Sequence, residues 1–284
     1  MFLPVVVYFF IFHYIPMYGV TLAFKDFNLS EGIMGSPWVG YKHFRDLTRT
    51  HSFTRALSNT VIISLLKLVA GFPAPIILAL LLNEIRDIRF KKTVQTISYL
   101  PHFLSWIILS GIFIQFLSLD GFVNTLLGFF GIEPIYFMAD NRWFRSILVI
   151  TDVWKGVGWG TIVHLATIAG INPELYEAAE CDGATRLYKM IHITLPMMGP
   201  TIAILLILNL GGILSAGFDQ IFNMYNNAVM ETADILDTYV YRTGLGSMRF
   251  SFATAVGLFK NGIGFFLVLM TNFISKKISG SGIW

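Results

Sequence analysis

The sequence predicts an all-α integral membrane protein with six transmembrane helices and a helical loop between the fourth and the fifth. Of its 284 residues, 55% are hydrophobic and only 13% are charged, and the mean hydropathy is +0.67. A soluble domain of this length needs far more charge to cover its surface. The apolar residues are also grouped into long runs, as a helix of about 20 residues crossing a bilayer core roughly 30 Å thick requires. Because these runs do not alternate with polar residues, we expect helices and not the strands of a membrane barrel.

Six segments are long and apolar enough to cross the membrane, and together they form one transmembrane domain over residues 1–284. The first, third and fifth contain no charged residue, the second contains only Lys67 and the sixth only Lys260. The fourth carries Asp152 and Lys155. The first run has no basic stretch before it and is too long for the core of a signal peptide, so we expect a retained helix. The expected spans cover residues 2–24, 56–82, 93–119, 147–171, 201–218 and 252–274.

An even number of spans places both termini on one side of the membrane. Lys and Arg are divided almost equally between the two sides, eight against nine, so their count does not decide the orientation. The density of basic residues does indicate the orientation, because four of them lie in the ten-residue loop 83–92. Basic loops tend to stay in the cytoplasm. We therefore expect both termini in the cytoplasm. The four residues are Arg86, Arg89, Lys91 and Lys92.

Several classes of function are excluded by what the sequence lacks. The net charge of +3 is small and spread along the chain, which does not suggest nucleic acid. Cys181 is the single cysteine and the six histidines are not closely paired, so we expect no metal site. No Gly-Lys dipeptide occurs, so the phosphate loop of an ATPase is absent. The glycines of Gly156–Gly160 lie inside an expected span, where close helix packing explains them better than nucleotide binding.

The segment Asn172–Pro196, between the fourth and fifth spans, predicts a compact pair of helices outside the membrane. Asn172 is suited to cap a helix that has Pro173 at its first position. Gly183 permits a bend, after which a second short helix is expected over Ala184–Ile191. Small residues on this projection favour close docking into a groove of another protein.

The same segment resembles the EAA loop of the permease subunits of binding-protein-dependent ABC importers. It has Glu-Ala-Ala at 177–179, a glycine after three further residues, and, after nine more, an Ile-x-Leu-Pro ending, in the expected loop. In that family the loop is cytoplasmic and fits a groove of the ATPase subunit. The residues that the resemblance assigns to coupling are Glu177, Ala178, Ala179, Asp182, Gly183, Ile193, Leu195 and Pro196.

Three other stretches resemble the carbohydrate-uptake branch of this family, in particular maltose-type and complex-oligosaccharide permeases. They are Tyr18–Phe24, Gly35–Gly40 and Tyr99–Trp106. The resemblance implies a multi-pass subunit of the bacterial cytoplasmic membrane that has no catalytic activity and no cofactor of its own. Its expected partners are a second, homologous permease, two ATPase subunits that bind ATP and Mg²⁺, membrane lipid, and an extracellular binding protein that delivers a sugar or oligosaccharide.

Charged side chains inside the expected spans are costly and mark a pathway or a partner. Asp152 and Lys155 lie three residues apart on one helix face, so we expect them to neutralise each other. Lys67 and Lys260 have no such neighbour. They either line a path for sugar, in which case an acidic oligosaccharide is a hypothesis, or pair with acids of a partner subunit. Trp154 and Trp159 either stack against sugar or pack against helices and lipid. The path candidates are Lys67, Asp152, Trp154, Lys155, Asn209, Lys260 and Asn261.

Two other transporter classes stay open at this point. One is a permease of the same ABC family for an amino acid, a peptide or phosphate. Only the three stretches that resemble carbohydrate-uptake permeases argue against it. An ion-coupled secondary transporter would usually show an internal repeat, and none is obvious in the sequence. A membrane enzyme is not supported, because no cluster of His, Asp or Glu occurs.

Overall fold

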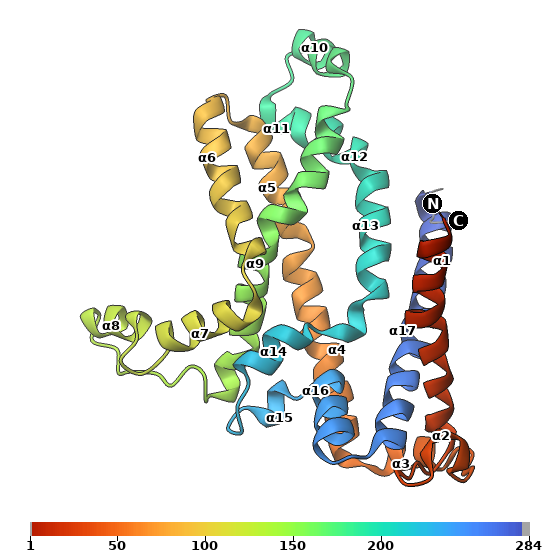
Figure 1. The fold of residues 1–284 in the computed structure, drawn as a ribbon. Helices are drawn as coiled ribbons and strands as arrows, with labels where there is room; N and C mark the ends of the chain where they lie inside the picture. Colours follow the sequence, from red (N-terminus) through yellow and green to blue (C-terminus); the bar gives the residue numbers. More distant parts are fainter. Residues whose placement is uncertain (1, 280–284) are drawn as a thin grey trace.

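The computed structural model describes residues 2–279 of the chain, and over this range it contains no β-strand. An isolated antiparallel bridge joins Lys25 and Trp38. The helices form a tall body, with α10 at one end and α2, α3, α15 and α16 at the other (Figure 1). The start of α1 and the end of α17 lie in the half that carries α10.

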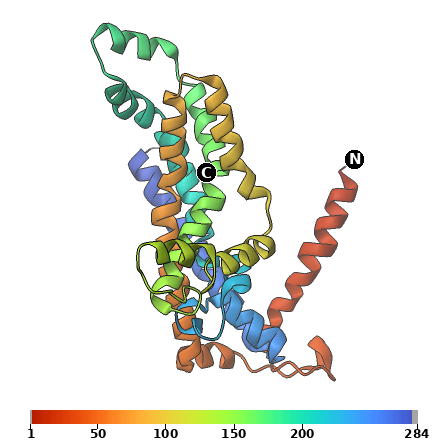
Figure 2. The ribbon, with the colours of Figure 1, turned by 90° about the vertical axis from the view of Figure 1, so that its left-hand side faces the viewer.

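The first expected span is a continuous helical segment, Leu3–Phe24. It consists of α1 (Leu3–Phe9), η1 (Phe10–Tyr14) and η2 (Ile15–Phe24). Figure 2 shows that its beginning diverges from the rest of the molecule, and its large apolar side chains are exposed. Only its far end, η2, lies against α17 (Phe250–Ser279). Two short helices follow, α2 (Gly32–Gly35) and α3 (Lys42–Arg49).

The centre of the body is a long helix pair in which two glycines of one helix let neighbouring helices approach closely. α4 (His51–Gly71) and α5 (Pro73–Glu84) run on as one segment of 34 residues, and α9 (Asn141–Ala169) packs along both. A Cβ atom added to Gly160 would lie 2.8 Å from Cγ of Pro75. A Cβ atom added to Gly158 would lie 2.0 Å from the carbonyl oxygen of Ser98. The packing role predicted for these two glycines is confirmed, whereas Gly156 faces open space.

The segment 93–119 does not form the uninterrupted helix that its apolar sequence suggests. α6 (Ile88–Tyr99) and η3 (Leu100–Phe103) are bent by 103° from α7 (Trp106–Phe116). Ser105 caps the new helix by accepting a hydrogen bond from the Ile108 amide. We call this segment span three. It continues into α8 (Phe122–Phe129), and α7 and α8 project sideways from the body (Figure 1).

The expected span 201–218 is also shorter than predicted. α13 (Gly199–Gly211) ends at a glycine pair and is followed by η5 (Ile213–Ser215) and two residues with left-handed backbone, Ala216 and Gly217. We call α13 and η5 span five. It is bent by 58° from the preceding helix, which consists of α11 (Arg186–Lys189), η4 (Met190–Thr194) and α12 (Leu195–Met197).

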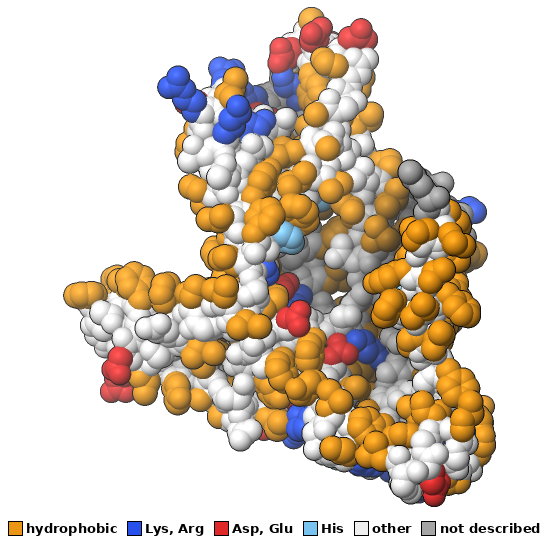
Figure 3. Space-filling view, in the orientation of Figure 1, with side chains coloured by type: hydrophobic (Ala, Val, Ile, Leu, Met, Phe, Trp, Pro, Cys, Tyr) orange, Lys and Arg blue, Asp and Glu red, His pale blue; other side chains and the backbone are white. Residues whose placement is uncertain are grey.

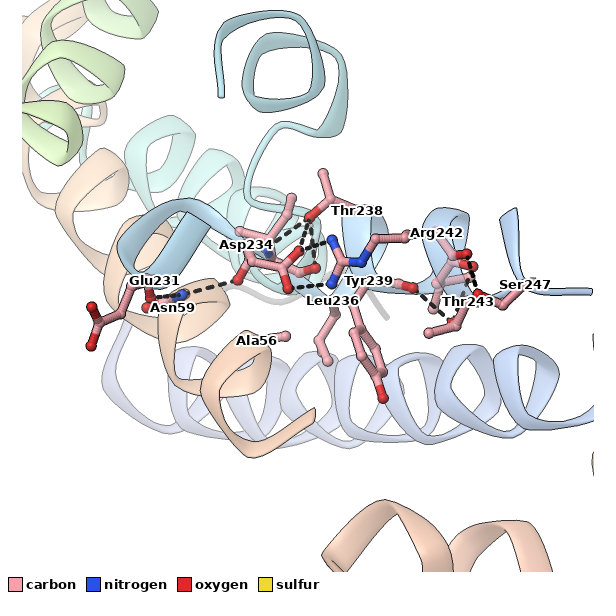
Figure 4. A network of polar contacts seen from close by, with 12 residues as sticks. Ala56, Asn59, Glu231, Asp234, Leu236, Thr238, Tyr239, Arg242, Thr243 and Ser247 are labelled. Atoms are coloured by element: carbon pink, nitrogen blue, oxygen red, sulfur yellow. Dashed lines mark hydrogen bonds and ion pairs between the residues drawn. The ribbon is translucent and has the colours of Figure 1, made fainter. Parts of the chain in front are cut away.

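The end opposite α10 is built around a buried carboxylate. The helices here are α14 (Phe218–Met224), α15 (Met230–Ala233), α16 (Leu236–Tyr241) and η6 (Arg242–Gly246). Asp234 is fully buried and accepts two hydrogen bonds from Arg242, at 3.0 and 2.7 Å. These bonds raise the pKa of Arg242 above its usual range. Asn59 of α4 donates to the carbonyls of Glu231 and Asp234, so the network ties this end to the central helices (Figure 4).

By length and hydropathy, three described helices are able to cross a membrane: Leu3–Phe24, His51–Glu84 and Phe250–Phe273. Five segments qualify if each bent pair is counted as one span. α9 is long enough, with 29 residues, but Asp152, Lys155 and several glycines lower its hydropathy.

Candidate functional site

A cavity of about 550 Å³ lies between α4, α9 and span five, with the end of η3 at its edge. Its wall includes Lys67, Asp152 and Asn209, three of the predicted path residues. Gly156, Gly212 and Gly217 widen it, because they add no side chain. Figure 3 shows a hollowed face between the central helices and α17 on which acidic and basic side chains gather amid apolar surface.

Lys67 is the best-connected polar group of this cavity. Its Nζ atom lies 3.3 Å from Oδ1 of Asp152 and donates to the Ala216 carbonyl at 2.9 Å and to Oε1 of Gln220. Gln220 is fully buried and donates in turn to the Leu148 carbonyl and the Thr151 hydroxyl. The lysine therefore joins α4, α9 and the break after span five.

This network corrects two expectations about charge. Asp152 pairs with Lys67 of another helix and not with Lys155, its neighbour on α9. Lys67 and Lys260 are not left for acids of a partner subunit, because Lys260 also has a partner in this chain, Asp237 of α16, at 2.5 Å. Both lysines are therefore compensated within the chain, and their charge does not indicate an acidic sugar.

An aromatic wall borders the same cavity. The rings of His102 and Trp159 stack with 4.4 Å between their centroids and an angle of 1° between their planes. Both residues line the cavity, and Trp159 is 46% exposed. Flat, half-exposed rings beside polar groups suit a ligand with apolar faces and hydroxyl edges. His102 is not among the predicted path residues, because in the sequence it stands out only as a member of Tyr99–Trp106, a stretch that resembles carbohydrate-uptake permeases.

The remaining path candidates lie outside this cavity. Trp154 is 47% exposed and meets Phe113 edge to face at 5.6 Å. Lys155 donates to the backbone carbonyls of span three. Asn261 lines a separate, mostly apolar groove between α16 and α17, together with Asp237. Lys67, Asp152 and Asn209 are therefore brought together, whereas Trp154, Lys155, Lys260 and Asn261 are not.

The loop after α9 forms a projecting helix and a tight turn. Asn172 caps α10 (Pro173–Cys181) by accepting a hydrogen bond from the Glu174 amide, as predicted. Gly183 makes the turn with a φ of +78°, a left-handed backbone that favours glycine. The second helix begins at Arg186, two residues later than expected, because Thr185 caps it. The helical segment also continues past Ile191, where it was expected to end, as far as Met197, and the 58° bend into span five follows.

Two contacts hold α10 onto the following helix. The hydroxyl groups of Tyr176 and Thr194 lie 2.9 Å apart. Lys189 donates to Glu180, and this bond lowers the pKa of Glu180, with Arg86 adding to the effect. Glu177, Ala178, Asp182, Gly183, Leu195 and Pro196 are exposed, whereas Ala179 and Ile193 are half-buried. The loop therefore presents an accessible surface, and side-chain contacts with the following helix hold α10 in place.

The described residues 2–279 contain no group of three or more His, Cys, Asp or Glu side chains able to hold a metal ion.

Comparison with known proteins agrees with this architecture. Residues 71–279 match the family described as binding-protein-dependent transport system inner membrane component. The chain is 46% identical, over its whole length and 89% of the relative's, to the polygalacturonan/rhamnogalacturonan transport system permease protein YteP of Bacillus subtilis.

Two solved structures have the same fold. One is a chain of a bacterial ABC transporter involved in the import of the acidic polysaccharide alginate. It is 44% identical with a TM-score of 0.92, and the match covers 98% of this chain and 94% of that one. The other is a chain of a bacterial alginate ABC transporter in complex with a periplasmic protein that holds an alginate pentasaccharide. It is 43% identical with a TM-score of 0.93, and the match covers 100% of this chain and 95% of that one. The chain therefore belongs to the family of binding-protein-dependent transport system inner membrane components, the permeases that its EAA pattern indicated.

Proposed function

We propose that this chain is a permease subunit of an ATP-driven importer, and that it forms half of the path for an oligosaccharide containing uronate residues. The observation that carries this proposal is the likeness over the whole chain, at 43–46% identity, to permeases named for polygalacturonan, rhamnogalacturonan and alginate. All three of these polymers contain sugars with carboxylate groups.

The cavity supports sugar as the substrate class. Asn209 and Asp152 offer hydrogen-bonding groups to hydroxyls, and the half-exposed ring of Trp159 offers a stacking face. The relatives, and not the cavity, are the evidence that the substrate is acidic. Lys67 of the cavity is already paired with Asp152 and so is not a free cation for a carboxylate.

The loop 172–200 is the proposed site of coupling to ATP. In this proposal it lies in the cytoplasm with both termini, the chain crosses the membrane six times, and α10 docks onto an ATPase subunit. A second permease completes the path, and two ATPase subunits bind ATP and Mg²⁺. A binding protein delivers the sugar at the opposite end. Acidic side chains at the tip of α10 and basic ones at the neighbouring end of α6 make this surface strongly charged (Figure 3).

The test is substrate-dependent ATP hydrolysis by the complex reconstituted in lipid with its binding protein. The panel compares uronate oligosaccharides with the same oligosaccharides after reduction of their carboxyl groups, and includes an amino acid and phosphate. We expect uronate oligosaccharides to stimulate hydrolysis, and Glu177→Lys and Gly183→Pro to abolish this stimulation while the complex still assembles. Stimulation by the amino acid or phosphate alone would show a permease for another solute. Transport driven by an ion gradient without ATP would overturn the proposal.

A further inference from the structure

Lys155 lies inside the predicted fourth span but contacts the backbone of span three. Its Nζ atom donates to the carbonyls of Leu104 at 2.6 Å and His102 at 2.9 Å, and lies 3.4 Å from the carbonyl of Pro101. It also lies 5.5 Å from the ring centroid of Trp106, the first residue of α7. One ammonium group therefore contacts both sides of the 103° bend.

The bend explains why a cation is needed there. At Leu104 the backbone becomes extended, so the helix ends; the Leu104 amide still donates to the Pro101 carbonyl, but no following turn supplies a donor for the carbonyls of His102 and Leu104. Inside a bilayer an unpaired carbonyl is costly, and a broken helix persists only where protein groups satisfy it. A lysine has three N–H donors and favours the carboxyl end of a helix, where the dipole is negative.

The same contact fixes the aromatic wall of the cavity. The carbonyl of His102 accepts from Lys155, while the ring of His102 stacks on Trp159. Lys155 and Trp159 are four residues apart and so lie on one face of α9. We infer that Lys155 is a positioning residue, which holds the bend of span three and thereby keeps His102 against Trp159, and that it does not bind the substrate.

Two observations argue against a direct substrate contact. Three carbonyl oxygens surround the three N–H donors of Lys155, which leaves none for a sugar carboxylate. Lys155 is also absent from the cavity wall, although its neighbours Asp152 and Gly156 belong to it. Lys67 shows the same use of lysine, since it donates to the Ala216 carbonyl at the break after span five.

The first experiment measures the bend itself and needs no substrate. Spin labels are placed at Phe90→Cys on α6 and Phe116→Cys on α7, both exposed, with the exposed Cys181 replaced by alanine. The complex is reconstituted in lipid, and the distance distribution is recorded by double electron–electron resonance. We expect one narrow distribution in the parent, a broader and shifted one in Lys155→Met, and recovery of the parent distribution in Lys155→Arg. Lys260→Met, which removes an intramembrane lysine away from this bend, serves as the matched control and should change nothing.

An unchanged distribution in Lys155→Met overturns the inference. If that variant does not assemble, Lys155→Gln takes its place, because its amide offers two donors and should broaden the distribution less.

The second experiment separates positioning from substrate binding, and its interpretation rests on the proposed function. Lys155→Met should raise KM by a similar factor, roughly two- to tenfold for the loss of one aromatic contact, for uronate and carboxyl-reduced oligosaccharides. Lys155→Arg should restore both values. A loss confined to uronate oligosaccharides would make Lys155 a substrate ligand and overturn the inference. If the solute is not a sugar at all, the proposed function fails while the distance measurement still decides on the bend.

Discussion

Lys67 of α4 and Asp152 of α9 form an ion pair at the wall of the cavity, with 3.3 Å between Nζ and Oδ1. The lysine side chain is only 10% exposed, whereas that of Asp152 is 37% exposed. The charged group that this chain turns most toward the cavity is therefore a carboxylate. Asp152 is placed to accept hydrogen bonds from sugar hydroxyls, and under the proposed function the ion pair itself offers no free cation to a uronate.

The first prediction concerns the coupling between these two charges. Replacing either one leaves the other without its counter-ion in a poorly solvated place, so Lys67→Met and Asp152→Asn should each lower thermal stability. The double variant should be less destabilised than the sum of the two single variants, with an interaction energy of about 0.5–3 kcal/mol. Thermal unfolding of the detergent-solubilised complex provides the measurement. Strictly additive effects would mean that the ion pair contributes nothing.

The second prediction uses two glycines on one helix. Gly158→Ala places a methyl group 2.0 Å from the Ser98 carbonyl oxygen, so α6 and α9 have to separate, whereas Gly156→Ala meets no atom within 4 Å. Overpacking of this kind typically costs about 1–3 kcal/mol. We expect Gly158→Ala to lower the melting temperature and Gly156→Ala to leave it nearly unchanged. Equal melting temperatures for the two variants would contradict the packing contact between α6 and α9.

Much of the fold follows from hydropathy, because long apolar runs can only form helices in a membrane. The breaks in spans three and five were not predicted, although Pro101 and the Gly211–Gly212 pair lie where the helices end. Proline and glycine are tolerated within membrane helices when other groups satisfy the freed backbone, so their presence alone does not decide between a helix and a bend. The deciding partners, Lys67 and Lys155, are distant in sequence from the carbonyls that they bind.

The loop 172–200 could be predicted from the sequence in more detail than the cavity. The caps and the turn of the loop 172–200 depend on neighbouring residues, so Asn172 and Gly183 could be assigned correctly. The cavity depends on pairs between helices. Gln220 lies beyond the expected fifth span, and the partners of Lys67 and Lys260 are 85 and 23 residues away along the chain. No local pattern indicates such pairs, so both alternatives for Lys67 and Lys260, a sugar path and acids of a partner subunit, left out an acid within the same chain.

The third prediction tests the turn in the loop 172–200, the proposed site of coupling to ATP. At Gly183 the φ of +78° is unfavourable for alanine by about 1–2 kcal/mol, whereas asparagine adopts this region more readily. Gly183→Ala should therefore reduce substrate-stimulated ATP hydrolysis more than Gly183→Asn does, with both variants assembled in equal amounts. A Cβ atom added at Gly183 would meet no atom within 4 Å, so the comparison reports the backbone angle and not a clash. If asparagine is as harmful as alanine, the requirement at this position is for the absence of a side chain and not for the backbone angle.

The fourth prediction compares two tryptophans of α9 that are almost equally exposed, Trp159 at 46% and Trp154 at 47%. Only Trp159 lines the cavity, where its ring lies stacked on His102. If sugar passes along this wall, Trp159→Ala should raise KM for transport by roughly two- to tenfold, the range expected for one aromatic contact. Trp154→Ala removes a ring of the same size that meets Phe113 outside the cavity, and KM should stay within twofold of the parent value. The measurement is the initial rate of uptake into proteoliposomes at varied oligosaccharide concentration. A larger effect at Trp154 would place the sugar path on the other face of α9, toward α7.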